Sequence, residues 1–340
     1  MTAFGMFKGR QVDCIRLDNG KLSCEILTYG ATLRSLKVPD REGKPVDVVL
    51  GFDTVEDYVN QDSYIGATVG PNANRIGGSS ISLGKQRLSL DRNEGENNLH
   101  SGFEGLNRQL WDVMAASEEA VTLLCTHPDG RGGFPGDLNA AVTYWLDRNA
   151  LLIEYRAVSQ KDTICNLTNH SYFNLDGHDS GSVAEHRIQL FAKSFTPIDA
   201  HSIPTGAIRA VSGSAMDLTK PVRLGERMDG EEEQLRLAGG YDHNYVIDPG
   251  EAPFRAAAKL WAAKSGVVMT VYTDRPGIQF YSGNYIPAGL RGKDGAVYQK
   301  RQGLCLETQA FPDAPNHSSF PSTVLRAGKE WMSRTMYQFG

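Results

Sequence analysis

The feature that most constrains the fold of this chain is a succession of short runs in which apolar and polar residues alternate, each ended by Gly, Pro, Asp or Asn. Alternation with a period of two is the pattern of a half-buried β-strand, and these terminating residues favour turns. Residues 13–17 and 21–27 flank Asp18-Asn19-Gly20, which predicts a β-hairpin. Only residues 53–60 and 223–237 show even a moderately helical period. The chain therefore predicts an all-β protein.

Similar runs recur along the rest of the chain. They cover residues 31–38, 46–50, 81–83, 87–90, 111–114, 120–126, 138–146, 151–158, 185–191, 254–261, 267–273, 278–282, 303–309 and 331–339. Their even spacing, together with 36 glycines, indicates a large antiparallel β-sandwich. No low-complexity or Pro/Ser-rich linker interrupts the sequence, so we expect a single domain over residues 1–340 although the length alone would allow two.

Composition and charge narrow the class of partner. A net charge of -5 supplies no basic stripe for nucleic acid or anionic lipid. The first ten residues lack a long apolar segment, and no later run approaches the length of a membrane span. The five cysteines are scattered and form no Cys-x-x-Cys pair, which indicates reduced thiols. We expect a soluble, cytoplasmic protein that binds a small molecule, with no nucleic-acid or membrane partner.

One stretch, residues 301–317, places a single carboxylate in an otherwise apolar strand. A strand over 303–309 puts Leu304 and Leu306 on one face and Cys305, Glu307 and Gln309 on the other, because side chains alternate. The prolines that follow end the strand just beyond the acid. Such a carboxylate is either partly desolvated, which raises its pKa toward that of a base useful at neutral pH, or turned outward into water. Taken alone, the outward orientation is the commoner outcome.

Two further segments are polar where a plain sandwich strand would be apolar on one face. In residues 163–175, extended geometry puts Asn166, Thr168 and His170 on one face. In residues 66–78, glycines allow the backbone to approach a ligand, and Asn74 and Arg75 offer hydrogen-bond donors. The structural alternatives are a histidine satisfied by its neighbours and an arginine in an ion pair.

The remaining polar segments lie at residues 93–102 and 239–247. The first is a loop that carries a second histidine, His100. The second places Asp242 and Asn244 on one strand face and aromatic residues on the other. Aromatic rings beside a carboxylate and an amide suit a sugar, which has apolar C–H faces and a rim of hydroxyls. The alternative is a strand with an ordinary core-facing row of aromatic residues.

The sequence lacks the motifs that are typical of several common activities. There is no Gly-Lys-Ser/Thr after the glycine-rich segment, no His-Glu-x-x-His, no Cys/His set at zinc spacing and no Gly-x-Ser-x-Gly. The sequence therefore predicts no phosphate loop, no metal site and no serine hydrolase. What remains is acid–base chemistry by Glu307, His170, His100 and Asp242.

Six motifs occur in an order that resembles the galactose mutarotase (aldose 1-epimerase) family over nearly the whole chain. They are Gly-Pro-Asn-Ala-Asn-Arg-Ile at 70–76, Asn-Asn-Leu-His at 97–100, Asn-Leu-Thr-Asn-His-Ser-Tyr-Phe-Asn-Leu at 166–175, Tyr-Asp-His-Asn-Tyr at 241–245, Pro-Gly-Ile-Gln-Phe-Tyr-Ser-Gly-Asn at 276–284 and Leu-Glu-Thr-Gln-Ala-Phe-Pro-Asp-Ala-Pro-Asn at 306–316. The resemblance implies the large antiparallel β-sandwich of that family, the mutarotase-like supersandwich, with a sugar bound in an open cleft.

The resemblance also implies roles for individual residues. Glu307 falls on the family's general base and His170 on its general acid. The positions that orient or bind the substrate fall on His100, Arg75, Asp242, Asn74 and Gln279. No cofactor is implied. Two positions depart from the pattern, since Ser101 stands where many relatives have Gly, and Met216 where an aromatic residue is frequent.

The implied reaction interconverts the α and β anomers of a free aldohexose such as galactose or glucose. A base removes the proton of the C1 hydroxyl while an acid protonates the ring oxygen, and this predicts a Glu307 pKa raised toward neutrality and a His170 that stays protonated near neutral pH. Three alternatives remain at this point. They are a hexose-phosphate 1-epimerase, which needs extra Arg or Lys in the cleft, an inverting glycosidase that uses Asp242 and Glu307, and a sugar-binding protein without turnover.

Overall fold

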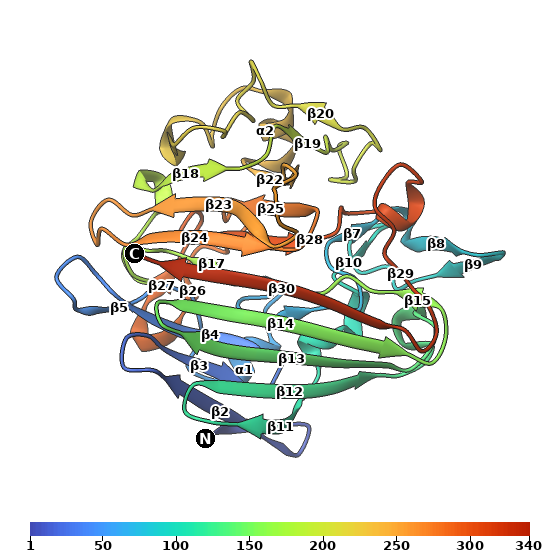
Figure 1. The fold of residues 1–340 in the computed structure, drawn as a ribbon, viewed down its shortest axis with the longest axis horizontal. Helices are drawn as coiled ribbons and strands as arrows, with labels where there is room; N and C mark the ends of the chain where they lie inside the picture. The colour runs from blue at the N-terminus through green and yellow to red at the C-terminus, as the bar shows by residue number, and fades with distance from the viewer.

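The computed structural model describes residues 1–340 and confirms the large antiparallel sandwich (Figure 1). Its largest sheet has nine strands, which run side by side across the view in Figure 1. Every neighbouring pair in this sheet is antiparallel. In spatial order the strands are β11 (Asp112–Ala116), β12 (Ala120–His127), β13 (Leu138–Asp147), β14 (Ala150–Ser159), β30 (Glu330–Phe339), β24 (Val268–Thr273), β23 (Arg255–Trp261), β18 (Arg187–Leu190) and β21 (Val222–Arg223).

Two further sheets are also antiparallel. The five-stranded sheet consists of β1 (Thr2–Phe7), β2 (Arg10–Asp18), β3 (Ser23–Leu27), β4 (Thr32–Pro39) and β5 (Pro45–Asp47). The six-stranded sheet has the order β17 (Tyr172–Phe173), β28 (Leu304–Gln309), β25 (Gly277–Tyr281), β22 (Asp242–Val246), β19 (Ser194–Phe195) and β20 (Arg209–Ala210).

Short ribbons and turns connect the sheets. The two-stranded ribbons are β6 (Thr68–Val69) with β16 (Thr168–Asn169), β7 (Arg75–Ile76) with β10 (Asn98–Leu99), β8 (Ser80–Leu83) with β9 (Gln86–Ser89), β15 (Thr163–Ile164) with β29 (Val324–Leu325) and β26 (Leu290–Arg291) with β27 (Val297–Tyr298). The two α-helices are α1 (Val55–Val59) and α2 (Glu233–Ala238). The 3₁₀ turns are η1 (Gly77–Ser79), η2 (Gly102–Glu104), η3 (Leu106–Arg108), η4 (Arg131–Gly133), η5 (Val183–Glu185), η6 (Leu224–Glu226), η7 (Lys293–Gly295) and η8 (Ala314–Asn316).

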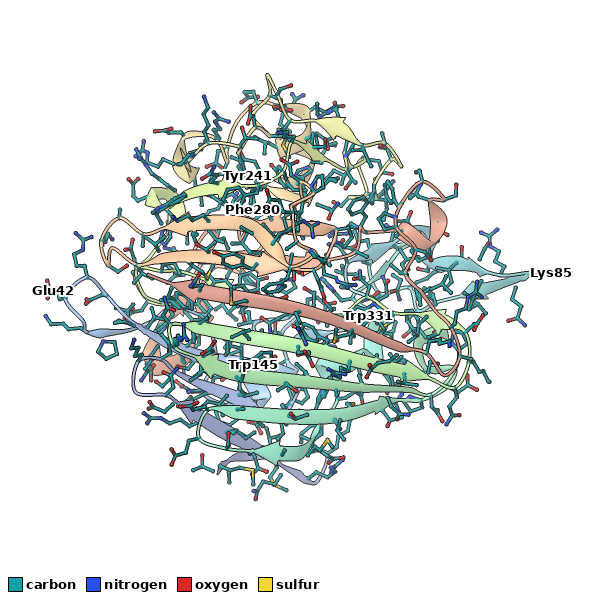
Figure 2. All side chains as sticks on the ribbon, in the orientation of Figure 1. Glu42, Lys85, Trp145, Tyr241, Phe280 and Trp331 are labelled. Atoms are coloured by element: carbon teal, nitrogen blue, oxygen red, sulfur yellow. The ribbon has the colours of Figure 1, made fainter.

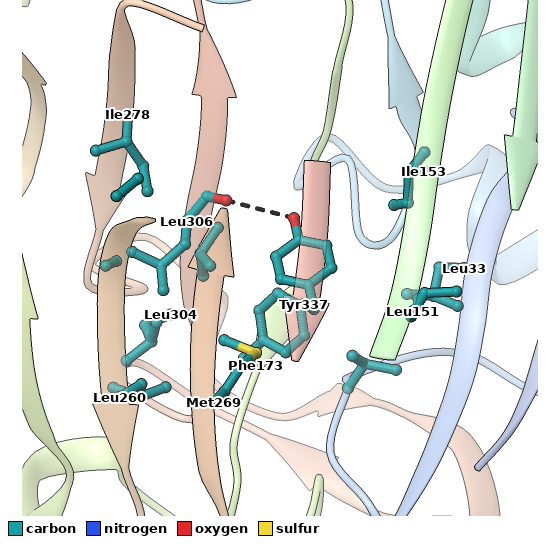
Figure 3. Packing of buried hydrophobic residues seen from close by; sticks show 14 of the residues in the cluster. Leu33, Leu151, Ile153, Phe173, Leu260, Met269, Ile278, Leu304, Leu306 and Tyr337 are labelled. Atoms are coloured by element: carbon teal, nitrogen blue, oxygen red, sulfur yellow. Dashed lines mark hydrogen bonds between the residues drawn. The ribbon is translucent and has the colours of Figure 1, made fainter. Parts of the chain in front are cut away.

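One hydrophobic cluster of 58 buried residues joins the sheets (Figure 3). Leu33 of the five-stranded sheet and Leu151 of the nine-stranded sheet both belong to it, as do Leu304 and Leu306 of β28. The hydroxyl of Tyr337 on β30 donates to the carbonyl oxygen of Leu306 at 3.4 Å, the dashed line in Figure 3. Because the apolar residues of β28 face this core, the alternate residues of the strand face the opposite side.

Side chains fill the space between the layers, whereas hairpin tips extend into solvent (Figure 2). Tyr241 and Phe280 are fully buried, with ring centroids 5.0 Å apart. Glu42 and Lys85 mark the exposed tips of the β4–β5 and β8–β9 hairpins. The buried rings show that the aromatic row of residues 241–245 faces the core, which was the structural alternative for those aromatic side chains.

The local predictions agree with the structure only in part. The predicted hairpin is confirmed as β2–β3, and α1 lies within the predicted helical segment 53–60. The predicted helix over 223–237 is wrong for most of its length, since only α2 at its end is α-helical and the start of the segment forms the 3₁₀ turn η6. Gly225 packs close to the carbonyl of Ala184, and Gly230 interrupts the segment before α2. Strand β1 and several two-residue strands, among them β26 and β29, have no counterpart among the predicted strands. No helix has the length and hydropathy of a membrane-spanning segment.

Candidate active site

Strand register brings three predicted site residues together on one face of the six-stranded sheet. Gln279 on β25 lies opposite Glu307 on β28, and Tyr281 on β25 lies opposite both Asp242 on β22 and Cys305 on β28. Because paired residues share a face and alternate residues return to it, all of these side chains lie on the face opposite Leu304 and Leu306. Glu307 is only 2% exposed, so it points into the protein rather than outward into water.

His170 reaches the same face from the segment between β16 and β17. Its main-chain N–H donates to the carbonyl of Ala67, and its carbonyl accepts from the N–H of Gly66. The imidazole Nε2 lies 3.8 Å from Glu307 Oε1, and the side chain is buried. Glu307 Oε2 has no hydrogen-bond partner in the protein. The acid and base proposed from the sequence are therefore neighbours, with one carboxylate oxygen free.

The two polar loops predicted from the sequence pair with each other through β7 and β10. Asn74 and His100 are joined by two hydrogen bonds. His100 N donates to the main-chain oxygen of Asn74 at 3.0 Å, and Asn74 N donates to the imidazole Nδ1 of His100 at 3.1 Å. Both residues adopt positive φ, 63° for Asn74 and 50° for His100. Such strain persists where surrounding contacts over-determine the backbone, a common property of functional sites.

Ser101, which follows His100, also has a positive φ, 70°. A left-handed backbone of this kind favours glycine. Here the serine hydroxyl compensates, because it accepts from Asn72 N at 2.8 Å and donates to Asn72 O at 3.0 Å. Met216, the second departure noted in the sequence, is fully buried in the main core. Neither side chain lines the pocket.

Arg75 links the loops to the sheet. Its guanidinium donates to both carboxylate oxygens of Glu94, at 2.7 and 2.8 Å, and its Nη1 lies 3.6 Å from Asp242 Oδ2. Asp242 Oδ1 accepts from Gln279 Nε2 at 2.7 Å. The result is a row of charge-assisted contacts from Glu94 through Arg75 and Asp242 to Gln279.

These groups surround a pocket of about 420 Å³. Among the predicted site residues, Glu307, His170, His100, Arg75, Asp242 and Asn74 line it, whereas Gln279 does not and touches it only through Asp242. The rest of the wall consists of Asp62, Ser63, Tyr64, Glu94, Leu99, Tyr172, Ser202, Tyr281 and Tyr285. A volume of this size with aromatic walls and converging polar groups suits a small ligand.

Burial shifts the pKa values of Glu307 and His170 in opposite directions. Burial and the nearby charge of Asp242 raise the pKa of Glu307 well above its usual value, against a lowering by Arg75. Burial lowers the pKa of His170 to about 4. The direction for Glu307 agrees with the sequence-based expectation. The expectation that His170 stays protonated near neutral pH is wrong for the free protein, because burial disfavours the charged imidazolium.

His100, His170 and Glu307 also have the composition of a metal site, since their ligand atoms lie within 4.8 Å of one another. The hydrogen bond from Asn74 N occupies the lone pair of His100 Nδ1. In neutral imidazole the other nitrogen, Nε2, then carries the proton. His100 therefore has no free lone pair for a metal ion, and its Nε2–H is oriented as a donor. Burial and the neighbouring His170 and Arg75 hold its pKa well below the usual value.

Sequence reasoning missed two notable pocket residues. Glu94 lies in the predicted polar loop, but nothing in its neighbourhood along the chain pairs it with Arg75. Tyr285 lies at the pocket and is 60% exposed. Tyr285 directly follows the motif at residues 276–284, and an aromatic residue at that place was the only signal in the sequence.

The fold and this pocket define a β-sandwich protein with a buried carboxylate–imidazole pair in a polar, aromatic-walled cavity. The family model for aldose 1-epimerase matches residues 13–338, and the chain belongs to that family. Galactose mutarotase of Mus musculus is 41% identical over 340 residues, covering 99% of this chain and 97% of the relative. Aldose 1-epimerase of Escherichia coli K12 is 35% identical, covering 95% of this chain and 93% of the relative.

Solved structures agree with this membership. An aldose epimerase homologue from C. elegans superimposes with a TM-score of 0.90 at 34% identity, covering 97% of this chain and 99% of the other. Galactose 1-epimerase from Lactobacillus acidophilus gives a TM-score of 0.87 at 26% identity, covering 100% of this chain and 97% of the other.

Proposed function

We propose that the protein is an aldose 1-epimerase, an isomerase that interconverts the α and β anomers of free aldohexoses such as galactose or glucose. The observation that carries the proposal is the buried pair of Glu307 Oε1 and His170 Nε2, 3.8 Å apart in the wall of the pocket. Membership of the aldose 1-epimerase family supports the same activity.

In the proposed ring opening, the Glu307 carboxylate takes the proton of the C1 hydroxyl while the His170 imidazolium gives its Nε2 proton to the ring oxygen. The C1–ring oxygen bond breaks, its electron pair stays on the ring oxygen, and C1 becomes an aldehyde carbon. Rotation about C1–C2 presents the other carbonyl face. Closure then reverses both proton transfers, which yields the other anomer and restores the ion pair.

The two working states of the pair contain the same number of protons. Carboxylate with imidazolium opens the closed sugar, and carboxylic acid with neutral imidazole closes the open chain. Burial raises the pKa of Glu307 and lowers that of His170, so it favours the neutral pair in the free protein. Transfer of one proton from Glu307 to His170 within the pocket produces the ring-opening state without a change in net charge.

Asp242, Arg75 and His100 bind and orient the sugar hydroxyls in this proposal. Asp242 is held by Arg75 and Gln279, so its acceptor oxygens are fixed before the sugar arrives. His100 offers its Nε2–H, and Asn74 fixes that tautomer through its main-chain N–H. Fixed donors and acceptors of this kind distinguish a hydroxyl from its absence.

A phosphorylated hexose fits the pocket poorly. Arg75 is its only Lys or Arg, and both Glu94 and Asp242 already engage that guanidinium. The other ionisable carboxyl groups in the wall are Asp62 and Glu307. A phosphate group would meet more negative than positive charge, which argues against the hexose-phosphate alternative.

The two remaining alternatives also find less support. An inverting glycosidase needs Asp242 as a free acid or base, but Arg75 and Gln279 occupy its carboxylate. A sugar-binding protein without turnover does not need a buried carboxylate beside an imidazole, since isolated charge is costly to bury. The acid–base pair therefore favours an enzyme.

We further propose one domain for residues 1–340, because the 58-residue core cluster runs from Ile15 to Phe339 without a division. The five cysteines are all unpaired thiols, which supports activity in a reducing compartment such as the cytoplasm.

Polarimetry tests the proposal. Freshly dissolved α-D-galactose and α-D-glucose should reach their equilibrium rotations faster with the protein than in buffer, whereas α-D-glucose 6-phosphate should show little acceleration. Cleavage of an aryl galactoside without mutarotation would indicate a glycosidase, and binding without either reaction would indicate a sugar-binding protein.

A further inference from the structure

The thiol of Cys305 contacts the imidazole of the proposed acid. Cys305 lies two residues before Glu307 on β28 and is fully buried on the same face. Its Sγ lies 3.5 Å from His170 Nδ1. The imidazole is thus held between the sulfur on Nδ1 and the Glu307 carboxyl group on Nε2.

We propose that Cys305 is a positioning residue whose sulfur accepts a hydrogen bond from His170 Nδ1–H, which leaves Nε2 as the nitrogen that exchanges a proton with the sugar ring oxygen. The inference rests on the proposed function, because it assigns the tautomer which that reaction needs.

The weakness of a thiol as an acceptor suits this position. A carboxylate on Nδ1 would stabilise the imidazolium strongly and would oppose the return of the neutral form in each half-cycle. A sulfur atom orients the ring and adds little to the affinity for the proton. Burial raises the pKa of the Cys305 thiol well above its usual value, so the sulfur stays uncharged at neutral pH.

The same contact persists through the whole cycle. Nδ1 keeps its proton in both the imidazolium and the neutral form, while Nε2 loses and regains its proton. The titratable groups that face His170 are few, and all of them are compatible with this assignment. They are Cys305, Glu307, Tyr172, Tyr281, His100 and Tyr64.

The direct test is the ¹⁵N and ¹H NMR spectrum of the imidazole nitrogens in the wild-type protein near neutral pH, assigned with a His170→Asn variant. We expect the neutral His170 to carry its proton on Nδ1. A proton on Nε2 in the free wild-type protein would overturn the inference. The spectrum reports the tautomer whether or not the protein turns over sugar, so failure here is separable from failure of the proposed function.

Variants at position 305 supply the functional test. We expect Cys305→Ala to lower kcat by about tenfold and to change KM by less than about twofold. Removing the hydrogen-bond partner of a functional histidine typically costs about tenfold or more in activity, and a weak sulfur acceptor should lie at the smaller end of that range. Its neutral His170 should show a larger share of the Nε2–H tautomer. Cys305→Ser retains an acceptor and should recover part of both losses, with a pH profile of kcat displaced from that of the wild type.

Cys24 is the matched control, because it is equally buried but lies on β3 of the five-stranded sheet. Cys24→Ala should leave kcat, the pH profile and the His170 tautomer unchanged, even where it costs stability. An unchanged kcat in Cys305→Ala, or equal losses of kcat in both alanine variants, would overturn the inference. If Cys305→Ala fails to fold, the wild-type spectrum and Cys305→Ser decide it.

Discussion

The two walls of the pocket are built differently. On one wall, Asp242 and Glu307 stand on strands whose opposite face packs into the 58-residue core. On the other wall, Arg75 and His100 stand on paired loops that rest on a separate cluster of five buried residues, Ile76, Ile81, Leu90, Phe134 and Ile164. Strand register fixes the first wall, whereas side-chain to main-chain hydrogen bonds and left-handed backbone fix the second.

This difference suggests a division of labour. A side chain in a sheet anchored by a large core moves little, which suits the groups that transfer protons over short distances. Loop residues supply adaptable donors that recognise hydroxyls. His170 joins the walls, since its main chain pairs with residues 66–67 and its imidazole lies against Glu307. Substitution of Glu307 on the sheet wall should therefore mainly affect kcat, whereas substitutions of binding groups on the loop wall should mainly affect KM.

The largest effect is expected for Glu307→Gln. Glutamine keeps the volume of the side chain and removes the base, so kcat should fall by roughly 10² to 10⁴, the usual contribution of general acid–base catalysis. Polarimetry of the purified variant measures the loss, and circular dichroism checks the fold. Near wild-type turnover in the folded variant would remove Glu307 from the proposed role and with it the distinction between the walls.

A smaller effect is expected for Asp242→Ala. Hydrogen bonds to charged groups contribute about 1.5 to 3 kcal/mol, so kcat/KM for the normal sugar should fall by about 10- to 150-fold. The loss should be smaller for a deoxy sugar that lacks the hydroxyl contacted by Asp242, which we expect at C2 or C3. Equal losses for the normal sugar and both deoxy analogues would mean that Asp242 acts through the fold or through His170.

The sheet wall is also the part of the site that the sequence predicts well. Alternation along 303–309 and 241–247 places Glu307 and Asp242 on defined faces, and the structure confirms those faces. The orientation of Glu307 toward the interior was not decidable from its own segment, because the sequence pattern is the same for a pocket and for solvent. Glu307 points inward because the loops of the other wall cover this face of the sheet.

The loop wall was predictable only in part. The motifs around Asn74 and His100 marked both loops as polar, but no local rule pairs Glu94 with an arginine 19 residues earlier. That contact depends on how the loops close over β7 and β10. The direction of the His170 pKa shift has the same origin, since it depends on burial by segments distant in sequence. The predicted helix over 223–237 failed because glycines and close packing limited it to α2.

A modest effect on binding is expected for Glu94→Gln on the loop wall. The variant removes the charge that holds Arg75 and leaves the shape of the side chain, so KM should rise by about fivefold, equivalent to about 1 kcal/mol, with little change in kcat. Glu96→Gln in the same loop is the control, because Glu96 is 80% exposed and pairs only with Arg92. A fall in kcat without a rise in KM would place Glu94 with the proton-transfer groups instead.

The smallest effect on activity is expected for His127 at the end of β12. This residue instead affects how the stability of the loop wall depends on pH. Its side chain is fully buried, neither ring nitrogen has a partner, and its ring lies 6.0 Å from that of Phe134, a member of the loop-wall cluster. Burial, aided by Arg131, lowers the pKa of His127 to about 4. The unfolded chain takes up this proton near pH 6.5, whereas the folded chain excludes it until about pH 4.

Stability from this group is therefore fully present above about pH 6.5 and is lost as the pH falls toward about 4, by about 2 kcal/mol at about pH 5. We expect His127→Leu to reduce the loss of unfolding free energy between about pH 7.5 and about pH 5 by that amount, measured by urea denaturation, and to leave mutarotation at neutral pH unchanged. The exposed His201 supplies the control variant His201→Leu. An equal loss of unfolding free energy at acid pH in the wild type and in His127→Leu would contradict this prediction. The pH dependence of stability would then come from the buried histidines elsewhere in the fold.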